Sequence, residues 1–401
     1  MQKRIKHIIF CLFVLAGSIA AQTKVSTFYD NEKKVIKEVY SVINHQKLGK
    51  VKHGLYTIWY PNKKIWQEGA YDYDLLDGKW LDYYEDGTLK QELNYKKGLL
   101  NDTSKYFYPS GKIMQIALYS NDTLHGVVYN YYENGKLQEK CYYKKGVLHG
   151  EFTAFFEDGR PRISKNYREG IENGQSVTWH ENGNIRDRVT MQNGVFEGQY
   201  IDYYKSYKNG TINKICHYKN GRLNGKLNAF FPSGKLKYEC LYNNDTIVGD
   251  IKEYFDSTKI ILRQTGGYLN GRKNGIWKTF YNNASIYSTG NYRNDLFEGE
   301  WLVYYPDGQL KHKGNYTKGK ATGEWIFYYE TGEVKNRGLY EDDNKTGIWK
   351  TYYKTGELMS EIPFVKGQRH GEAKAYNQKG KLVETTQYDN GNDITKQRKK
   401  K

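Results

Sequence analysis

The stretch from residue 77 to residue 87 reads Asp-Gly-Lys-Trp-Leu-Asp-Tyr-Tyr-Glu-Asp-Gly, and Leu89 and Tyr95 follow it. Close variants of this phrase recur along the chain. With the glycine at residue 78 as position 0, equivalent positions lie 24 residues apart in eleven of thirteen steps, and the other two steps are 27 and 26 residues. The 401 residues therefore contain fourteen repeats. Their zero positions are Gly54, Gly78, Asp102, Gly126, Gly150, Gly174, Gly198, Gly225, Gly249, Gly275, Gly299, Gly323, Gly347 and Gly371.

Four positions of the repeat are occupied by the same type of residue in nearly every copy, and they indicate the fold. Position +5 is aromatic in all fourteen repeats, and position +6 is Tyr or Phe in twelve. Position +11 is Ile, Leu or Val in thirteen repeats, and position +17 is Tyr in twelve. Glycine occupies +9 in eleven repeats, and Gly or Asp occupies +20 in all of them, as expected of tight turns. Each repeat is therefore predicted to be a β-hairpin with a second turn at +20.

These hairpins predict an all-β fold, an elongated, solenoid-like single array of about fourteen stacked antiparallel β-hairpins. At about 10 Å per repeat, the array would reach roughly 130 Å. Pairing +6 with +10 places +5 opposite +11, as in Tyr83 and Leu89. By strand alternation, +15 and +17 share that face, which we expect to be buried. Position +15 is small in most repeats, which indicates bulk nearby.

The opposite face is expected to carry the aromatic residues at +2 and +6, with basic residues at +12 and +14 such as Lys311, Lys313, Lys335 and Arg337. Exposed flat rings are platforms for a ligand, so these aromatic residues form the candidate binding face. The alternative is that the rings only pack between neighbouring hairpins. The candidate residues are Trp80, Tyr84, Trp277, Tyr281, Trp301, Tyr305, Trp325, Tyr329, Trp349 and Tyr353.

The two ends of the chain differ from the repeats. Residues 1–20 have a basic start and a short apolar run that ends in small residues, which predicts a removable signal peptide. Residues 21–52 fit the repeat poorly and are expected to form an N-terminal cap or half-repeat, before the array at 53–393. Residues 394–401 form a basic tail. Of the formal net charge of +17, the signal carries +3 and the tail +5, which leaves a mild excess of +9 over the rest of the chain, and nucleic-acid binding is not expected.

The repeat phrase resembles the variant MORN repeat (membrane occupation and recognition nexus) of bacterial proteins, often labelled antitoxin-type. The resemblance covers about Lys52 to Asp393. It implies stacked hairpins that serve as protein-binding scaffolds, with membrane association in some relatives and toxin neutralisation in some bacterial ones. An export signal conflicts with a cytoplasmic antitoxin role and leaves an immunity role in the envelope open.

No motif for catalysis, a cofactor or a metal stands out, so we expect no enzyme. The cysteines at 141, 216 and 240 all fall at +15 and are interpreted as small apolar fillers. Cys216 and Cys240 lie one repeat apart, at about 10 Å, which is too far for a disulfide, so no disulfide is expected. Four histidines, at 53, 125, 149 and 370, precede position 0 and mark a turn. The acidic run 341–343 is expected to be a solvated turn.

The sequence therefore favours an exported, non-enzymatic scaffold that binds protein partners in the cell envelope, whether periplasmic, outer-surface or secreted. The alternative is a carbohydrate- or cell-wall-binding protein that uses an exposed Trp/Tyr ladder. Contact with a membrane surface through the basic tail is a further option, and the oligomeric state is not indicated.

Overall fold

The computed structural model describes residues 22–205 and 210–395. The expected signal peptide lies outside these residues, as does the basic tail beyond residue 395. The chain divides into two compact units, Met1–Asn173 and Gly174–Lys401. All 35 elements of the described ranges are β-strands. Within those ranges, no helix has the length and apolar character that a membrane span requires.

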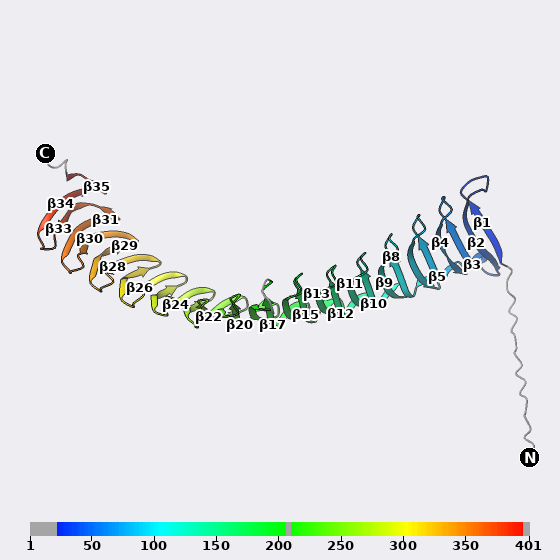
Figure 1. The fold of residues 1–401 in the computed structure, drawn as a ribbon, viewed down its shortest axis with the longest axis horizontal. Coiled ribbons are helices and arrows are strands. Elements are labelled where there is room, and N and C mark those ends of the chain that lie inside the picture. The colour runs from blue at the N-terminus through cyan, green and yellow to red at the C-terminus, as the bar shows by residue number, and fades with distance from the viewer. Residues whose placement is uncertain (1–21, 206–209, 396–401) are drawn as a thin grey trace, which may run out of the picture. The chain divides into compact units, whose positions relative to one another are not determined.

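Unit 1 is an up-and-down series of strands in which each hairpin pairs with the next (Figure 1). Its strands are β1 (Thr23–Phe28), β2 (Ile36–His45), β3 (Gly49–Trp59), β4 (Ile65–Asp72), β5 (Leu75–Tyr83), β6 (Leu89–Lys96), β7 (Leu99–Leu100), β8 (Asp102–Phe107), β9 (Ile113–Ser120), β10 (Thr123–Tyr131), β11 (Leu137–Lys144), β12 (Val147–Phe155), β13 (Pro161–Arg168) and β14 (Ile171–Glu172).

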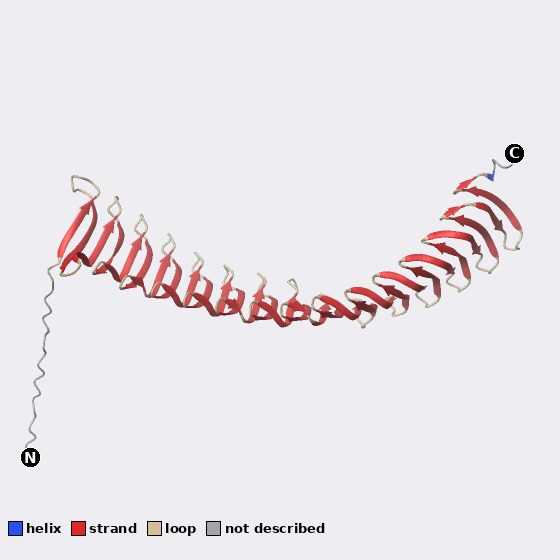
Figure 2. Ribbon diagram, turned by 180° about the vertical axis from the view of Figure 1, so that it is seen from behind, coloured by secondary structure: helices blue, strands red, loops and turns tan. Residues whose placement is uncertain are grey.

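Unit 2 repeats this arrangement. Its strands are β15 (Gly174–Trp179), β16 (Ile185–Gln192), β17 (Val195–Tyr203), β18 (Ile212–Lys219), β19 (Arg222–Leu223), β20 (Gly225–Phe230), β21 (Leu236–Asn243), β22 (Thr246–Tyr254), β23 (Leu262–Leu269), β24 (Arg272–Phe280), β25 (Ile286–Arg293), β26 (Leu296–Tyr304), β27 (Leu310–Thr317), β28 (Lys320–Tyr328), β29 (Val334–Glu341), β30 (Asn344–Tyr352), β31 (Leu358–Val365), β32 (Gln368–Arg369), β33 (Gly371–Tyr376), β34 (Leu382–Asp389) and β35 (Asn392–Asp393). Short turns join the strands (Figure 2). The expected all-β array of stacked antiparallel hairpins is confirmed.

The register of each hairpin contains one irregularity that the sequence pattern does not reveal. Tyr83 pairs with Leu89, which confirms the expected +5/+11 pair. The neighbouring Asp82 pairs with Gln91, however, so Lys90 at +12 is an extra residue in the second strand. Such a β-bulge shifts the pairing by one residue and turns the side chains beyond it to the other face. The expectation that +15 shares a face with +5 and lies opposite +2 is therefore wrong.

After the bulge, +2 pairs with +15, as Trp325 does with Gly338. One face of the sheet, the Trp face, consequently carries positions +2, +4, +13, +15 and +17. The other, the polar face, carries +1, +3, +5, +14 and +16. Most of the buried core lies on the Trp face, including Trp80, which is 1% exposed.

The small residues at +15 make room for the Trp of the following repeat. A Cβ atom placed on Gly314 would lie 2.0 Å from the ring of Trp325, and one on Gly290 would lie 1.7 Å from Trp301. These distances are far shorter than van der Waals contact. The expectation that +15 is small because of nearby bulk is confirmed. Cys141, Cys216 and Cys240 lie buried in the same column, as expected of small apolar fillers.

The turn at +20 joins each repeat to its neighbour through the backbone. The Asp343 amide donates to the Ala321 carbonyl at 3.0 Å, and the Ala321 amide donates back to the Asp343 carboxylate at 2.7 Å. Asp343 has φ of 67°, and Gly319, in the equivalent turn of the preceding repeat, has φ of 84°. Asp and Gly tolerate this left-handed region, which explains the restriction to these two residues.

The N-terminal residues 23–45 form a complete hairpin, which is more than the half-repeat that the sequence indicates. Strand β1 pairs with β2 and places Val25 opposite Tyr40, the equivalent of the +2/+15 pair. The hydroxyl of Tyr29 donates to the carbonyl of Trp59 at 2.7 Å. This hairpin therefore packs on the first repeat as the repeats pack on one another.

Candidate binding face

The tryptophans of the candidate face lie in the packed layer of the Trp face. Trp80, Trp277, Trp325 and Trp349 are buried, with at most 6% of each residue exposed, and Trp301 is partly buried. The indole N–H of Trp349 donates to the carbonyl of Leu339 at 3.1 Å, so the polar atom of this ring is also satisfied inside the sheet. The expectation of an exposed ladder is therefore wrong for these rings. The bulge at +12 is the physical reason, because it turns +2 toward +15.

The tyrosines at +6 join successive repeats. The hydroxyl of Tyr329 donates to the carbonyl of Tyr352 at 2.9 Å, and Tyr353 donates to Tyr376 at 2.8 Å. Ten such bonds occur within the described residues, and all five candidate tyrosines take part. The donors are Tyr29, Tyr60, Tyr84, Tyr108, Tyr132, Tyr204, Tyr281, Tyr305, Tyr329 and Tyr353.

The basic residues at +12 lie over the rings at +6. The ammonium group of Lys311 is 5.5 Å from the ring centre of Tyr305, and that of Lys335 is 5.7 Å from the ring of Tyr329. Trp66 stacks on Tyr60 in the same way in the first repeat. The aromatic residues at +2 and at +6 therefore both pack between hairpins, as the alternative interpretation expects.

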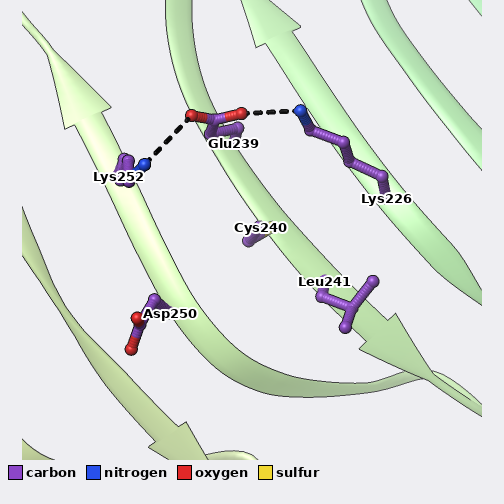
Figure 3. Close-up of a pocket in the computed structure, with 6 residues that line it drawn as sticks. All are labelled: Lys226, Glu239, Cys240, Leu241, Asp250 and Lys252. Carbon is purple, nitrogen blue, oxygen red and sulfur yellow. Dashed lines mark ion pairs between the residues drawn. The ribbon is translucent and has the colours of Figure 1, made fainter.

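The polar face holds a recurring carboxylate site that the sequence analysis missed. Glu239, at +14, accepts a hydrogen bond from the hydroxyl of Tyr254, at +5 of the next repeat, at 2.9 Å. Its carboxylate also lies 2.8 Å from the ammonium group of Lys226 and 4.0 Å from that of Lys252. Figure 3 shows both lysines reaching the carboxylate across adjacent strands. A tyrosine hydroxyl and two lysines thus hold one carboxylate.

The contacts within this site shift the pKa values of Glu239 and Tyr254. The hydrogen bond from Lys226 keeps the pKa of Glu239 below its usual value, with a smaller contribution from Tyr254. Burial raises the pKa of Tyr254 to about 12, and the bond to Glu239 adds to this shift. At neutral pH the glutamate is therefore charged and the tyrosine is a donor.

A shallow depression of about 290 Å³ lies beside this carboxylate, lined by Lys226, Glu239, Cys240, Leu241, Asp250 and Lys252 (Figure 3). Burial raises the pKa of the Cys240 thiol to about 11, so the thiol stays protonated at neutral pH. A protonated thiol is a poor nucleophile.

The same carboxylate site recurs in other repeats. The hydroxyl of Tyr83 donates to Glu68 at 2.7 Å, and that of Tyr376 donates to Glu361 at 3.2 Å. Lys350 lies 3.1 Å from Glu361. The recurrence of glutamate at +14 is visible in the sequence. Its tyrosine partner lies in the next repeat, however, so only the strand register between repeats reveals that the two residues form a pair.

The remaining polar residues singled out in the sequence occupy turns. His53 and His370 lie 3.2 Å from Asp72 and Asp389, on the turn side of their repeats. In the acidic run 341–343, the last carboxylate accepts a backbone N–H. These residues shape turns between repeats, as their positions in the sequence indicate.

A model of the MORN repeat variant matches residues 52–73, 76–97, 103–121, 124–145, 223–244, 297–318, 321–342, 345–366 and 369–390. No curated protein matches the chain. Among solved structures, the crystal structure of TcdB2-TccC3-Cdc42 matches at 12% identity with a TM-score of 0.15, over 92% of this chain and 23% of that one. A Photorhabdus luminescens Tc holotoxin pore matches at 10% identity with a TM-score of 0.13, over 89% of this chain and 29% of that one.

The chain spans less than a third of the length of these solved chains, and similarity this weak carries no argument about function. The family match agrees with the hairpin register at every matched stretch, and several of these stretches carry the tyrosine bonds between repeats. The model of the MORN repeat variant thus matches nine stretches of this chain, and the structure folds these stretches into stacked β-hairpins.

Proposed function

We propose that the protein is an exported, non-enzymatic scaffold of the cell envelope that binds a protein partner on the polar face of its repeats. MORN repeats support a scaffold for binding. The observation that carries the choice of face is a group of exposed apolar side chains in unit 2. Ile348 is 55% exposed and Leu339 is 46% exposed. Ile348 pairs with Pro363, and Leu339 pairs with Thr346, two residues before Ile348, so the three lie side by side.

Exposed apolar side chains that cluster beside charged ones are typical of protein interfaces. The Trp face offers less of this surface, because its large rings pack against one another and against the +15 column. The glycan-binding alternative depended on an exposed Trp/Tyr ladder, and the burial of four of its tryptophans removes that support. An immunity protein against an envelope toxin would be one form of the proposed scaffold.

The test is cross-linking of the mature protein in its own cell envelope, followed by identification of the proteins recovered. Leu339→Glu with Ile348→Glu should abolish recovery of the partner, whereas Leu269→Glu, at a residue 55% exposed near a turn, should not. Equal recovery by all three proteins would contradict the proposal. N-terminal sequencing tests export separately, because a mature chain should begin near Ala21 and an intact Met1 would exclude removal of a signal.

A further inference from the structure

A hollow of about 400 Å³ lies on the polar face of unit 2, over β15, β16 and β17. It belongs to other repeats than the patch formed by Leu339 and Ile348. Arg188, at +14, pairs with Val177 on one neighbouring strand and with Ile201 on the other. The guanidinium group in the hollow is therefore flanked by two aliphatic side chains.

Arg188 has no anionic partner. Its guanidinium group forms no hydrogen bond or ion pair with any residue that the structure describes. Arg337, at the same position of a later repeat, pairs with Glu324 at 2.8 Å. The residue that corresponds to Glu324 beside Arg188 is Gln175, and its amide carries no charge. The positive charge of Arg188 is therefore not compensated within the sheet.

The surroundings of Arg188 contain no carboxylate that turns toward it. In the two repeats that form the hollow, no polar-face position is Asp or Glu. Asp187 and Asp202, which pair with each other, occupy +13 and +4 on the Trp face. The carboxylate of Glu197 accepts the backbone N–H of Asn220 at 2.7 Å, in a turn. The hollow is thus suited to a ligand that brings its own negative charge.

The two ends of the hollow differ in chemistry. One end is lined by Trp179, a half-buried ring whose indole N–H has no acceptor among the described residues. The other end is lined by the polar side chains of Gln175, Thr190 and Gln199. On β15, Gln175 and Trp179 are four residues apart, which is about 13 Å. Amide groups both donate and accept hydrogen bonds, as the hydroxyl groups of a sugar do.

We propose that this hollow binds an acidic oligosaccharide. The carboxylate of one sugar pairs with Arg188, the apolar face of a sugar ring packs on Trp179, and hydroxyl groups bond to the amides at the opposite end. A flat ring, aliphatic walls, amides and one cation match a ligand that combines rings, hydroxyl groups and a negative charge. This site does not depend on the buried tryptophans at +2, because Trp179 occupies +5.

The strand pairing favours a sugar over an acidic peptide. A sheet usually binds an extended peptide at an open edge, where backbone hydrogen bonds supply the affinity. Strand β16, which carries Arg188, pairs with β15 on one edge and with β17 on the other. A peptide lying over the hollow would find only side chains as partners for its own backbone groups, whereas a sugar needs only side chains.

The test is isothermal titration calorimetry of the mature full-length protein at low ionic strength, with digalacturonate and sialyllactose as the acidic probes. The methyl ester of each probe is the neutral control, and triglutamate is the acidic-peptide control. At least one acidic probe should bind. Its methyl ester should bind about tenfold more weakly or worse, because the charge-assisted contact with Arg188 is lost.

Two substitutions take the cation out of use. Arg188→Gln deletes its charge, and Gln175→Glu gives it a partner of the kind that Glu324 gives to Arg337. Each should weaken binding of the acidic probe about tenfold or more. Trp179→Leu should weaken binding severalfold, because the flat ring is lost. Arg337→Gln is the matched control, since it removes a cation from the same repeat position at a distant site, and it should change binding less than about twofold.

Circular dichroism checks that every variant is folded. Absence of binding by both acidic probes, equal binding of the methyl esters, an equal loss in Arg337→Gln, or tighter binding of triglutamate would each overturn the proposal. Leu339→Glu with Ile348→Glu should bind the acidic probe as the wild type does, so the outcome is separate from that of the protein-partner proposal.

Discussion

The packing of a tryptophan on a glycine makes one substitution unusually informative. In Gly314→Ala, the new methyl group would lie 2.0 Å from the ring of Trp325. Ordinary contact is near 3.5 Å, so the ring must move by about 1.5 Å. That shift disturbs the edge-to-face contacts of the ring with Tyr316 and Tyr340, whose centres lie 5.2 and 5.7 Å away. We expect a loss of about 2–3 kcal/mol, in the range for an overpacked core.

The same methyl group should be harmless once the ring is gone. Trp325→Ala alone should cost about 3–5 kcal/mol, as for other large-to-small substitutions of buried aromatic residues. In that background, Gly314→Ala should be neutral or stabilising by up to about 1 kcal/mol, because alanine reduces the freedom of the unfolded chain and Gly314 has no left-handed backbone to protect. The sign of the effect of Gly314→Ala therefore changes between the two backgrounds.

Urea unfolding followed by circular dichroism measures the four proteins of this cycle, and hydrogen exchange across β27 to β30 supplies a local readout, because repeat arrays need not unfold in one step. Gly319→Ala is the matched control. Its φ of 84° strains any alanine, so it should be destabilising by a similar amount in both backgrounds. An equal cost of Gly314→Ala with and without the ring would refute the packing argument.

Three further predictions concern the bonds that join the repeats. Tyr329→Phe should destabilise the array by about 1 kcal/mol in urea unfolding, since it leaves a backbone carbonyl without its donor, whereas Tyr304→Phe, whose hydroxyl has no partner within the described residues, should cost almost nothing. Asp343→Ala should destabilise more than Asp343→Gly, because only the first also strains φ, and both should speed amide exchange at Ala321. The pKa of Tyr254 is raised to about 12, so the stability that its neutral form contributes is complete below pH 10 and is lost as the pH rises through 12. Tyr254→Phe should therefore make the free energy of unfolding less dependent on pH across that window. An unchanged pH profile would contradict the role given to the Tyr254 hydroxyl.

The hairpins themselves were predictable from the sequence, and the faces of the sheet were not. Glycine at +9 and Gly or Asp at +20 set the turns, and the +5/+11 pair followed from them, as Tyr83 and Leu89 confirm. The extra residue at +12 has no compositional mark, since Lys90 looks like any exposed strand residue. One inserted residue is enough to reverse which side chains are buried. The sequence pattern therefore identifies the repeat position of Trp80 correctly but assigns this tryptophan to the exposed face of the sheet instead of the buried one.

The carboxylate site escaped prediction for a different reason. Its members, such as Glu239 and Tyr254, belong to different repeats, and a column-by-column comparison aligns each residue only with its equivalents. Position +14 is Glu in some repeats and Lys, Arg or Thr in others, so no single residue type or charge marks it in the sequence. The pairing becomes visible only when β21 and β22 are seen side by side.

The tyrosine bond at +6 has a direction, because each repeat that carries this tyrosine donates its hydroxyl to a backbone carbonyl of the repeat that follows. The contact survives changes in the hairpin tip. Tyr204 reaches the carbonyl of Phe230 at 2.7 Å although its hairpin is three residues longer than the standard one. The bond is missing where +6 is not tyrosine, at Phe156, His180, Phe231 and Phe255 and at Asn377 in the last repeat. Consecutive repeats that all carry this tyrosine, such as those with Tyr281, Tyr305, Tyr329 and Tyr353, meet their neighbours through the same donor and acceptor. Within such a run, gene duplication or deletion can change the number of repeats in whole steps and leave this bond unaltered.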